Sequence, residues 1–361
     1  MRACCANVGR EESNHPLQFP WRIVQCKLWL SILYGFSTKV VFMSLSVSRR
    51  TFFAATAASV AASTLSTAQP ALAAAETGLP FRFCLNTSTI RECQYQGKKI
   101  DILGGIEVAS KAGYTGIEPW IGEIDTYTKN GGTLSDLRKR IADAGLTVES
   151  AIGFSAFLHE DENERKKGLE EAKRCMGLVR DIGGTRIAAP PVGVTDKTGL
   201  DPFNLATRYR ALCELGQSEG VYPQLELWGF AKTLARMGEV AFVGVEAAHP
   251  YACSLLDIYH IFKGGSDFEG LAMFAASRMY NFHVNDYPAD PPREKINDAA
   301  RVYPGDGVAP LGKIFRTLRD NGYRGVVSLE LFNREYWKQD AFEVAKTGLE
   351  KTKEAVHKAL A

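Results

Sequence analysis

The feature that most constrains the fold of this chain is a regular alternation of short apolar runs with longer amphipathic stretches, from residue 81 to the C-terminal end. Short apolar runs bounded by glycine, proline or polar residues are typical of buried strands, and a three-to-four-residue apolar period is typical of helices. Eight strands are expected, at residues 81–85, 116–119, 147–151, 185–189, 223–227, 252–256, 280–284 and 326–329. Helices are expected at residues 102–112, 134–144, 162–182, 202–219, 268–278, 310–321 and 340–358.

Four of the expected helices end in the same way, with a glycine that is followed within four residues by the next strand. These glycines are Gly113, Gly145, Gly183 and Gly322. Glycine is favoured there because the residue after a helix often adopts the left-handed conformation. Short helix-to-strand connections indicate parallel strands, and eight of them favour an α/β fold of the closed (β/α)8 TIM barrel type over an open sheet. No Gly-x-Gly-x-x-Gly follows the first strand, which also disfavours an open dinucleotide-binding sheet.

The N-terminal region has the pattern of an export signal. Arg49 and Arg50 precede an Ala-rich, weakly apolar stretch that ends in Ala71-Leu72-Ala73, as in a cleaved twin-arginine signal peptide. An uncleaved membrane anchor is the alternative, but alanine, serine and threonine dominate the stretch. Such signals begin shortly before their arginines, so Met43 is the expected start. The predicted organisation is a non-native extension (1–42), a twin-arginine signal (43–73) and a barrel (80–358), with the mature protein in the periplasm or outside the cell and not inserted in the membrane.

Charge and cysteine content limit the classes of partner. The formal net charge is +2 for the whole chain, and it becomes slightly negative without the basic N-terminal 73 residues, which argues against a nucleic-acid partner. The cysteines beyond residue 73 form no Cys-x-x-Cys pair. Cys175, Cys213 and Cys253 lie in apolar contexts and are expected to be buried thiols, whereas Cys84 and Cys93 either do the same or pair in an oxidising compartment.

Acidic or imidazole side chains stand at the ends of the last four expected strands: Glu226 in PQLELWGF, Asp257 in CSLLDIYH, His283 in YNFHVNDY and Glu330 in VVSLELFN. Because all strands of a parallel barrel point their C-terminal ends at one rim, these side chains are expected to converge. One such acid, taken alone, more often caps a helix or anchors a loop. Four of them, each after an apolar run where an unpaired charge is costly, indicate a site for a hard or borderline divalent cation.

These segments resemble those of the xylose isomerase-like TIM barrels, a group that includes ketose 3-epimerases, hydroxypyruvate isomerase and inosose dehydratase. The resemblance covers nearly all of residues 80–358 and includes Asp257-x-x-His260 and the segment Arg301-Val-Tyr-Pro-Gly-Asp-Gly307. It implies that one divalent cation is held by Glu226, Asp257, His283 and Glu330, and that His260 and Arg301 contact the substrate. Mn²⁺ is the expected ion, with Mg²⁺, Co²⁺ and Zn²⁺ as alternatives.

The residue types also predict a reaction. A divalent ion that polarises a sugar carbonyl acidifies the proton on the adjacent carbon, so that an enediolate can form. We expect Glu226 and Glu330 to move that proton as an acid/base pair, with Asp257 and His283 as purely structural ligands. His260 is expected to orient the substrate oxygen and Arg301 to stabilise its negative charge. The alternative for His260 is a residue at a helix start that only hydrogen-bonds the loop.

Other residues near the rim are less informative. Asn86, Glu118, Trp120, Phe154 and Trp228 lie at or just after the ends of expected strands, and each could contact a sugar or simply pack. His159 adjoins an acidic run typical of an exposed helix start and is left out of the catalytic set. The long segment 286–301 is expected to form a lid or a subunit contact of a homo-oligomer.

The predicted function is that of a metal-dependent isomerase or epimerase of a small carbohydrate. A lyase or dehydratase acting on an inosose or a 3-keto-glycoside remains the alternative, because it would use the same enolate chemistry. A nuclease with a histidine-rich zinc site is disfavoured, because the whole chain contains just six histidines. A noncatalytic carbohydrate-binding role also stays open, and no Arg/Lys cluster indicates a phosphate pocket.

Overall fold

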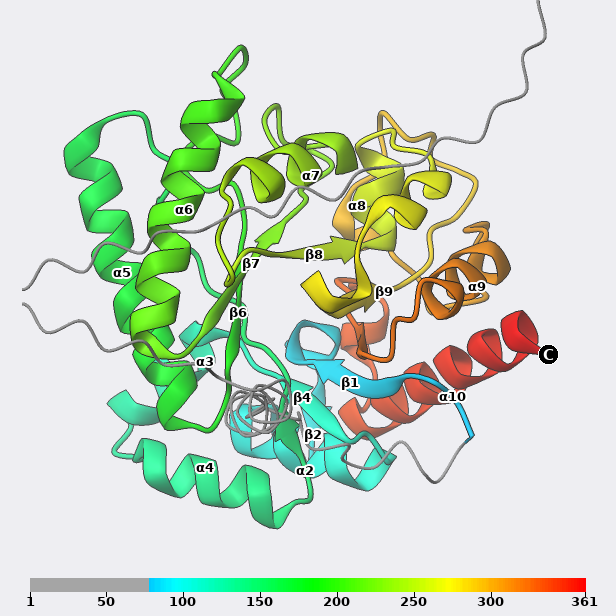
Figure 1. Ribbon diagram of the computed structural model, residues 1–361. Coiled ribbons are helices and arrows are strands. Elements are labelled where there is room, and N and C mark those ends of the chain that lie inside the picture. The colour runs from blue at the N-terminus through cyan, green and yellow to red at the C-terminus, as the bar shows by residue number, and fades with distance from the viewer. Residues whose placement is uncertain (1–77) are drawn as a thin grey trace, which may run out of the picture. The chain divides into compact units, whose positions relative to one another are not determined.

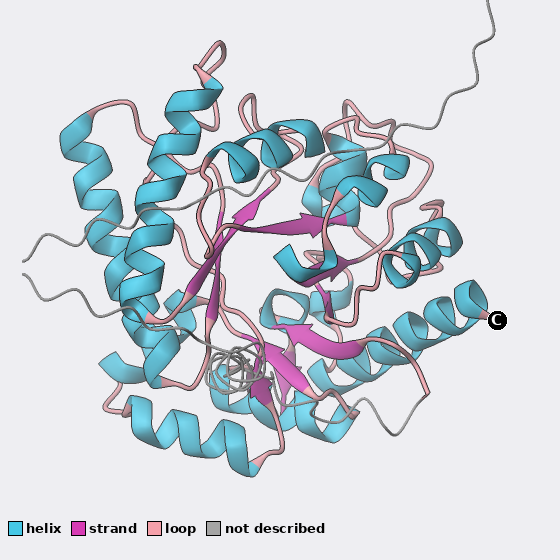
Figure 2. Ribbon diagram, viewed as in Figure 1, coloured by secondary structure: helices cyan, strands magenta, loops and turns pink. Residues whose placement is uncertain are grey.

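A computed structural model describes residues 78–361, so the predicted extension (1–42) and twin-arginine signal (43–73) lie outside the described residues. At its centre is an eight-stranded parallel sheet, with helices around the outside (Figures 1 and 2). Its strands are β1 (Arg82–Asn86), β4 (Gly116–Glu118), β5 (Thr147–Val148), β6 (Arg186–Ala189), β7 (Tyr222–Glu226), β8 (Cys253–Asp257), β9 (Met279–Val284) and β10 (Val326–Leu329).

The sheet curls so that the first strand of the chain meets the last. The strand order is β5-β4-β1-β10-β9-β8-β7-β6, which leaves β5 and β6 as the two edges. Two backbone hydrogen bonds join the chain at these edges. The N–H of Ala151 donates to the carbonyl of Arg186 (3.2 Å), and the N–H of Ala188 donates to the carbonyl of Ala151 (2.9 Å). The predicted (β/α)8 TIM barrel is therefore confirmed.

The helices follow the strands along the outside of the barrel (Figure 1). They are α2 (Ile102–Ala112), α3 (Ile121–Lys129), α4 (Leu134–Asp143), α5 (Glu162–Asp181), α6 (Pro202–Glu219), α7 (Met237–Glu246), α8 (Ile258–Lys263), α9 (Leu311–Asp320) and α10 (Ala341–Leu360). The glycines predicted to end helices all have positive φ, for example 92° at Gly113 and 82° at Gly322. A two-stranded hairpin, β2 (Gln94–Tyr95) and β3 (Lys98–Lys99), lies in the loop after β1.

One predicted helix, 268–278, is wrong. The segment forms two short 3₁₀ helices, η2 (Phe268–Met273) and η3 (Ala276–Arg278), because Phe274 and Ala275 between them have extended backbone conformations. The α-helix of this repeat is α8, which begins directly after Asp257. At six residues, α8 is too short to show a helical period in the sequence.

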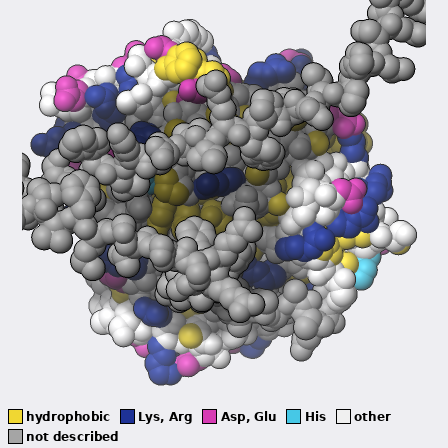
Figure 3. Space-filling model, in the orientation of Figure 1, with side chains coloured by type: hydrophobic (Ala, Val, Ile, Leu, Met, Phe, Trp, Pro, Cys, Tyr) yellow, Lys and Arg dark blue, Asp and Glu magenta, His cyan; other side chains and the backbone are white. Residues whose placement is uncertain are grey.

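The core is a continuous cluster of buried apolar side chains between the sheet and the helices. All five cysteines of the described region are buried and free, so Cys84 and Cys93 do not pair. No helix within residues 78–361 has both the length and the apolar character needed to span a bilayer. Where described side chains are visible in Figure 3, Lys and Arg lie among Asp and Glu.

Candidate metal site

The barrel brings the four predicted strand-end residues to one rim. Glu226 and Asp257 are the last residues of β7 and β8, His283 lies in β9 opposite Asp257 and Ser328, and Glu330 directly follows β10. All four side chains are buried, with exposed fractions of 0% for Asp257 and His283, 3% for Glu330 and 4% for Glu226. Four ionisable groups shielded from water need partners among themselves or a cation.

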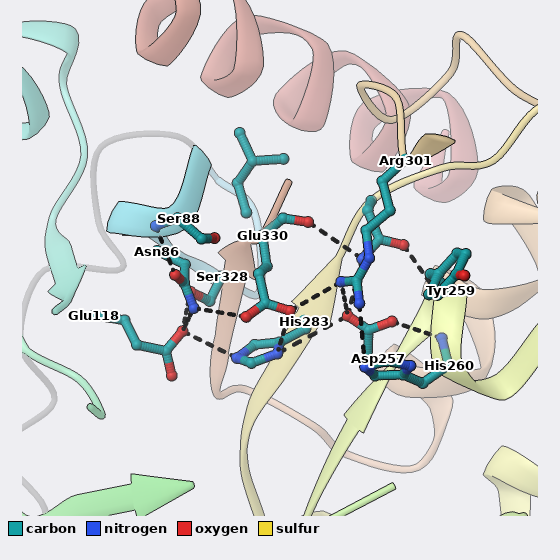
Figure 4. A network of polar contacts seen from close by, with 12 residues as sticks. Asn86, Ser88, Glu118, Asp257, Tyr259, His260, His283, Arg301, Ser328 and Glu330 are labelled. Atoms are coloured by element: carbon teal, nitrogen blue, oxygen red, sulfur yellow. Dashed lines mark hydrogen bonds and ion pairs between the residues drawn. The ribbon is translucent and has the colours of Figure 1, made fainter. Parts of the chain in front are cut away.

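Three of the four form a compact cluster (Figure 4). One potential ligand atom each from Asp257, His283 and Glu330 lies within 4.8 Å of the others. The Nδ1 atom of His283 is 3.2 Å from Glu330 Oε2 and 3.9 Å from Asp257 Oδ2. It is buried and makes no hydrogen bond of good geometry. Two carboxylates and an unengaged imidazole nitrogen are a donor set that fits a divalent cation such as Mn²⁺ or Zn²⁺.

Glu226 lies outside this cluster but lines the same pocket as Glu330. Its burial, together with the nearby carboxylates of Glu330 and Asp257, raises its pKa to about 8, although His283 opposes this. Burial would also raise the pKa of Glu330, but His283 and Arg301 outweigh it and hold that pKa well below its usual value. Two glutamates in one pocket thus have pKa values shifted in opposite directions, as in many acid/base pairs.

The imidazole of His283 is held between carboxylates on both sides. Burial opposes its charged form, yet Glu330 and Glu118 hold the pKa of His283 well above its usual value. Asp257 has two tasks: its Oδ2 atom faces His283, while its Oδ1 atom accepts the backbone N–H of His260 at 2.8 Å and caps α8. The Asp-x-x-His spacing is therefore that of an N-cap.

The guanidinium of Arg301 binds the carboxylates of two predicted metal ligands. Its Nη1 atom donates to Asp257 Oδ2 and to Glu330 Oε2, both at 2.9 Å, and the side chain is 1% exposed. Its Nη2 atom donates to Asp298 Oδ1 at 2.6 Å. The same atom lies 3.1 Å from His260 Nε2 and must be the donor there, because a guanidinium has no acceptor atom. Burial opposes the charge of Arg301, but the surrounding carboxylates raise its pKa. Both predicted substrate-binding residues line the pocket and are bound to each other.

A second set of polar residues, at the ends of β1, β4 and β10, completes the network (Figure 4). Glu118 Oε2 lies 3.0 Å from His283 Nε2 and accepts hydrogen bonds from Ser328 Oγ (2.7 Å) and Asn86 Nδ2 (2.9 Å). Asn86 Nδ2 also donates to Glu330 Oε1 at 3.1 Å. Sequence reasoning left Asn86 and Glu118 undecided and missed Ser328. The strand-end position was the one signal available for Glu118.

The pocket over these residues has a volume of about 190 Å³ and an aromatic wall. Its rings are those of Trp120, Phe154, Trp228, Phe230 and Phe332. Neighbouring ring centroids lie 5.4 Å apart for Trp120 and Phe154 and 5.8 Å apart for Phe154 and Trp228. Such a wall suits the apolar face of a sugar ring. His159 does not line the pocket; its Nδ1 atom accepts the N–H of Asp161 at the start of α5.

The segment 286–301 lies along one side of the pocket and is hydrogen-bonded to the barrel. The Asp286 carboxylate accepts backbone N–H groups from Tyr287, Gly305, Gly307 and Ala309. On α8, the Lys263 ammonium donates to three carbonyl groups of the segment, at residues 293, 294 and 296. The segment contributes Asp298 and Arg301 to the pocket.

The comparisons with known proteins agree with this geometry. Residues 106–355 match the xylose isomerase-like TIM barrel family. An inosose isomerase of Bacillus velezensis is 27% identical over 282 residues, which cover 77% of this chain and 98% of that protein. A 3-dehydroshikimate dehydratase of Pseudomonas aeruginosa is 25% identical over 252 residues, which cover 67% of this chain and 37% of that protein. The crystal structure of an IOLI protein with a bound zinc atom has a TM-score of 0.70 at 22% identity and covers 78% of this chain and all 100% of its own.

Proposed function

Because the chain belongs to the xylose isomerase-like TIM barrel family, we propose that it is a divalent-metal-dependent isomerase or epimerase of a small carbohydrate. The observation that carries the proposal is the buried cluster of Asp257, His283 and Glu330, in which Glu330 lines the same pocket as Glu226 and has a pKa shifted in the opposite direction. The similarity to an inosose isomerase over 98% of its length supports the same class of reaction.

In this proposal Asp257, His283 and Glu330 hold one divalent cation, with Glu226 as a fourth ligand. Mn²⁺ is the proposed ion, and Mg²⁺, Co²⁺ and Zn²⁺ are the alternatives, since the donor set of oxygens and one imidazole suits each of them. When bound, such an ion would supply Lewis-acid polarisation of the substrate carbonyl, which would acidify the proton on the neighbouring carbon.

The proton is moved by the two glutamates. One glutamate accepts the proton of the substrate carbon and the other returns one, and the opposite pKa shifts of Glu226 and Glu330 support unequal roles for the two. Return to the same carbon on its other face inverts the centre, and return to the neighbouring carbon moves the carbonyl. Arg301 and His260 line the pocket beside them, where the guanidinium can stabilise negative charge on a substrate oxygen and the imidazole can orient it.

A lyase or dehydratase acting on an inosose or a 3-keto-glycoside is the second candidate. It is favoured by the similarity to a 3-dehydroshikimate dehydratase. It would use the same proton abstraction by one glutamate, with the other glutamate delivering a proton to the departing oxygen.

One experiment separates the two candidates. The Mn²⁺-loaded full chain would be incubated in deuterated water with ketoses, inososes and 3-keto-glycosides. NMR would follow the exchange of the proton on the carbon next to the carbonyl for deuterium. Exchange without release of water or an aglycone supports the isomerase, and release supports the lyase. A protein that binds Mn²⁺ but exchanges no proton of any of these compounds would contradict both.

The proton-transfer roles are tested by Glu226→Gln and Glu330→Gln. Each is expected to lower turnover by at least about 100-fold, because the amide cannot accept or deliver the proton. Glu294→Gln, on an exposed carboxylate of the 286–301 segment, is the matched control and is expected to keep wild-type turnover. Wild-type turnover in either of the first two variants would refute the assignment.

The cellular place of the protein remains a proposal from sequence. We propose export by the twin-arginine route, cleavage near residue 73 and a periplasmic or extracellular barrel spanning residues 80–358, supported by Arg49, Arg50 and the Ala-x-Ala sequence before the barrel. Removal of the first 73 residues from the exported protein, seen by mass spectrometry, is the expected result.

A further inference from the structure

Glu118 is a buried acid at the end of β4 that does not line the pocket, and its position needs an explanation. Its side chain is 0% exposed, and among the described residues its ion-pair partner is His283. A carboxylate without an arginine or lysine partner is costly to bury, so its hydrogen bonds must compensate. They all involve one oxygen, Oε2, which lies within 3.0 Å of donors on Asn86, His283 and Ser328.

The direction of these hydrogen bonds is fixed by Asn86. The amide oxygen of Asn86 accepts the backbone N–H of Ser88 at 3.0 Å and the indole N–H of Trp120 at 2.9 Å. The amide nitrogen must therefore be the atom that faces Glu118 and Glu330, as Figure 4 shows for these carboxylates. Glu118 Oε2 is consequently an acceptor, and an acceptor oxygen 3.0 Å from His283 Nε2 requires a hydrogen on that nitrogen.

The consequence for His283 follows from the chemistry of imidazole. A neutral imidazole carries one N–H, so a hydrogen fixed on Nε2 leaves the lone pair on Nδ1. Nδ1 is the atom that lies 3.2 Å from Glu330 Oε2 and 3.9 Å from Asp257 Oδ2 and makes no hydrogen bond of good geometry. The opposite tautomer would direct an N–H at the position where a cation would lie.

We infer that Glu118 is a positioning residue, which holds His283 in the Nε2–H tautomer with Nδ1 directed at the cation site. Ligating histidines are commonly oriented by a carboxylate on the other ring nitrogen, and loss of such a carboxylate weakens metal binding. The inference rests on the proposed metal-dependent function. It assigns Glu118, three strands away from β9 in the sheet, to the second layer of the site.

The test measures the affinity of the full chain for Mn²⁺ by calorimetry in wild type and Glu118→Gln. The variant is expected to bind roughly 10- to 100-fold more weakly, since the uncharged amide oxygen holds the Nε2–H of His283 less strongly than the carboxylate does. Glu123→Gln is the control: Glu123 is a partly buried carboxyl near the rim, but it accepts from Thr87 Oγ1 and the Trp120 N–H and does not contact His283. It is expected to bind Mn²⁺ with an affinity near that of wild type.

A second measurement does not depend on any variant. In the Zn²⁺-loaded wild type, ¹⁵N NMR of the histidine side chains is expected to show the hydrogen of His283 on Nε2. A hydrogen on Nδ1, or equal Mn²⁺ affinities in wild type and folded Glu118→Gln, would overturn the inference while leaving the proposed function intact. A wild-type chain that binds neither Mn²⁺ nor Zn²⁺ would overturn both. If Glu118→Gln does not fold, the NMR result on the wild type decides alone.

Discussion

Replacement of Arg301 by methionine is the change whose effect the structure predicts most sharply. The guanidinium is fully buried and donates to Asp257, Glu330 and Asp298, so it neutralises two carboxylates of the predicted metal site. Methionine has a similar length but no charge. Arg301→Met therefore leaves Asp257 and Glu330 buried without a cationic partner at 2.9 Å.

The magnitude can be worked out from this burial. Removal of one partner of a buried ion pair destabilises a protein by about 3–5 kcal/mol, because the remaining charge is uncompensated. For a domain of this size each kcal/mol lowers the melting temperature by about 2–4 °C, so a decrease of about 6–20 °C is expected without metal. A divalent cation supplies positive charge to the same oxygen atoms. At 100 times its dissociation constant it would restore about 2.7 kcal/mol.

The assay is thermal unfolding followed by circular dichroism, in EDTA and in excess Mn²⁺. Mn²⁺ is expected to raise the melting temperature more in Arg301→Met than in wild type, where the guanidinium competes for Asp257 and Glu330. Arg180→Met is the control: Arg180 is half-exposed in its pairs with Asp181 and Glu219, so this change should leave the melting temperature close to that of wild type. An Arg301→Met protein with the same melting temperature as wild type in EDTA would refute the reasoning.

Two further predictions concern proton release and backbone packing. Mn²⁺ binding at pH 7 should release protons, because burial and neighbouring carboxylates raise the pKa of Glu226 to about 8, so the affinity should increase as the pH rises through this range. Calorimetry in buffers of different ionisation enthalpy counts the released protons, and no release would mean that Glu226 does not ligate. Gly264→Ala should lower stability by about 1–3 kcal/mol, because its Cβ would lie 1.8 Å from the Ala235 carbonyl oxygen. Gly238→Ala, in α7 with open space around it, should stabilise by about 0.5–1 kcal/mol, and equal melting temperatures for the two variants would contradict the packing argument.

The fold could be predicted from the sequence because its local patterns agree with one another. Each of the eight apolar runs became a strand of the sheet, and the glycines that end helices have the positive φ that their position requires. The predicted helix 268–278 failed for a local reason. Its apolar spacing is that of a helix, but extended residues at Phe274 and Ala275 divide it, and the Asp257 cap starts the real helix ten residues earlier.

The meeting of Asp257, His283 and Glu330 was also predictable, because a parallel barrel directs its strand ends to one rim. The contacts that these residues make with other side chains could not be predicted from the sequence. Glu118 reaches His283 across β1 and β10, a contact that depends on how the side chains pack inside the barrel. Nor did the sequence indicate that Arg301 would bind the ligand carboxylates.

The two glutamates of the proposed acid/base pair show where sequence reasoning ends. Both lie in the same tripeptide, Leu225-Glu226-Leu227 and Leu329-Glu330-Leu331, so no local feature can tell them apart. Burial raises the pKa of one to about 8, whereas His283 and Arg301 lower the pKa of the other. Their difference arises from residues that are distant in sequence and that only the closed barrel brings to Glu330. An assignment of acid and base in this family of folds must therefore start from the neighbours of each carboxyl group and not from its motif.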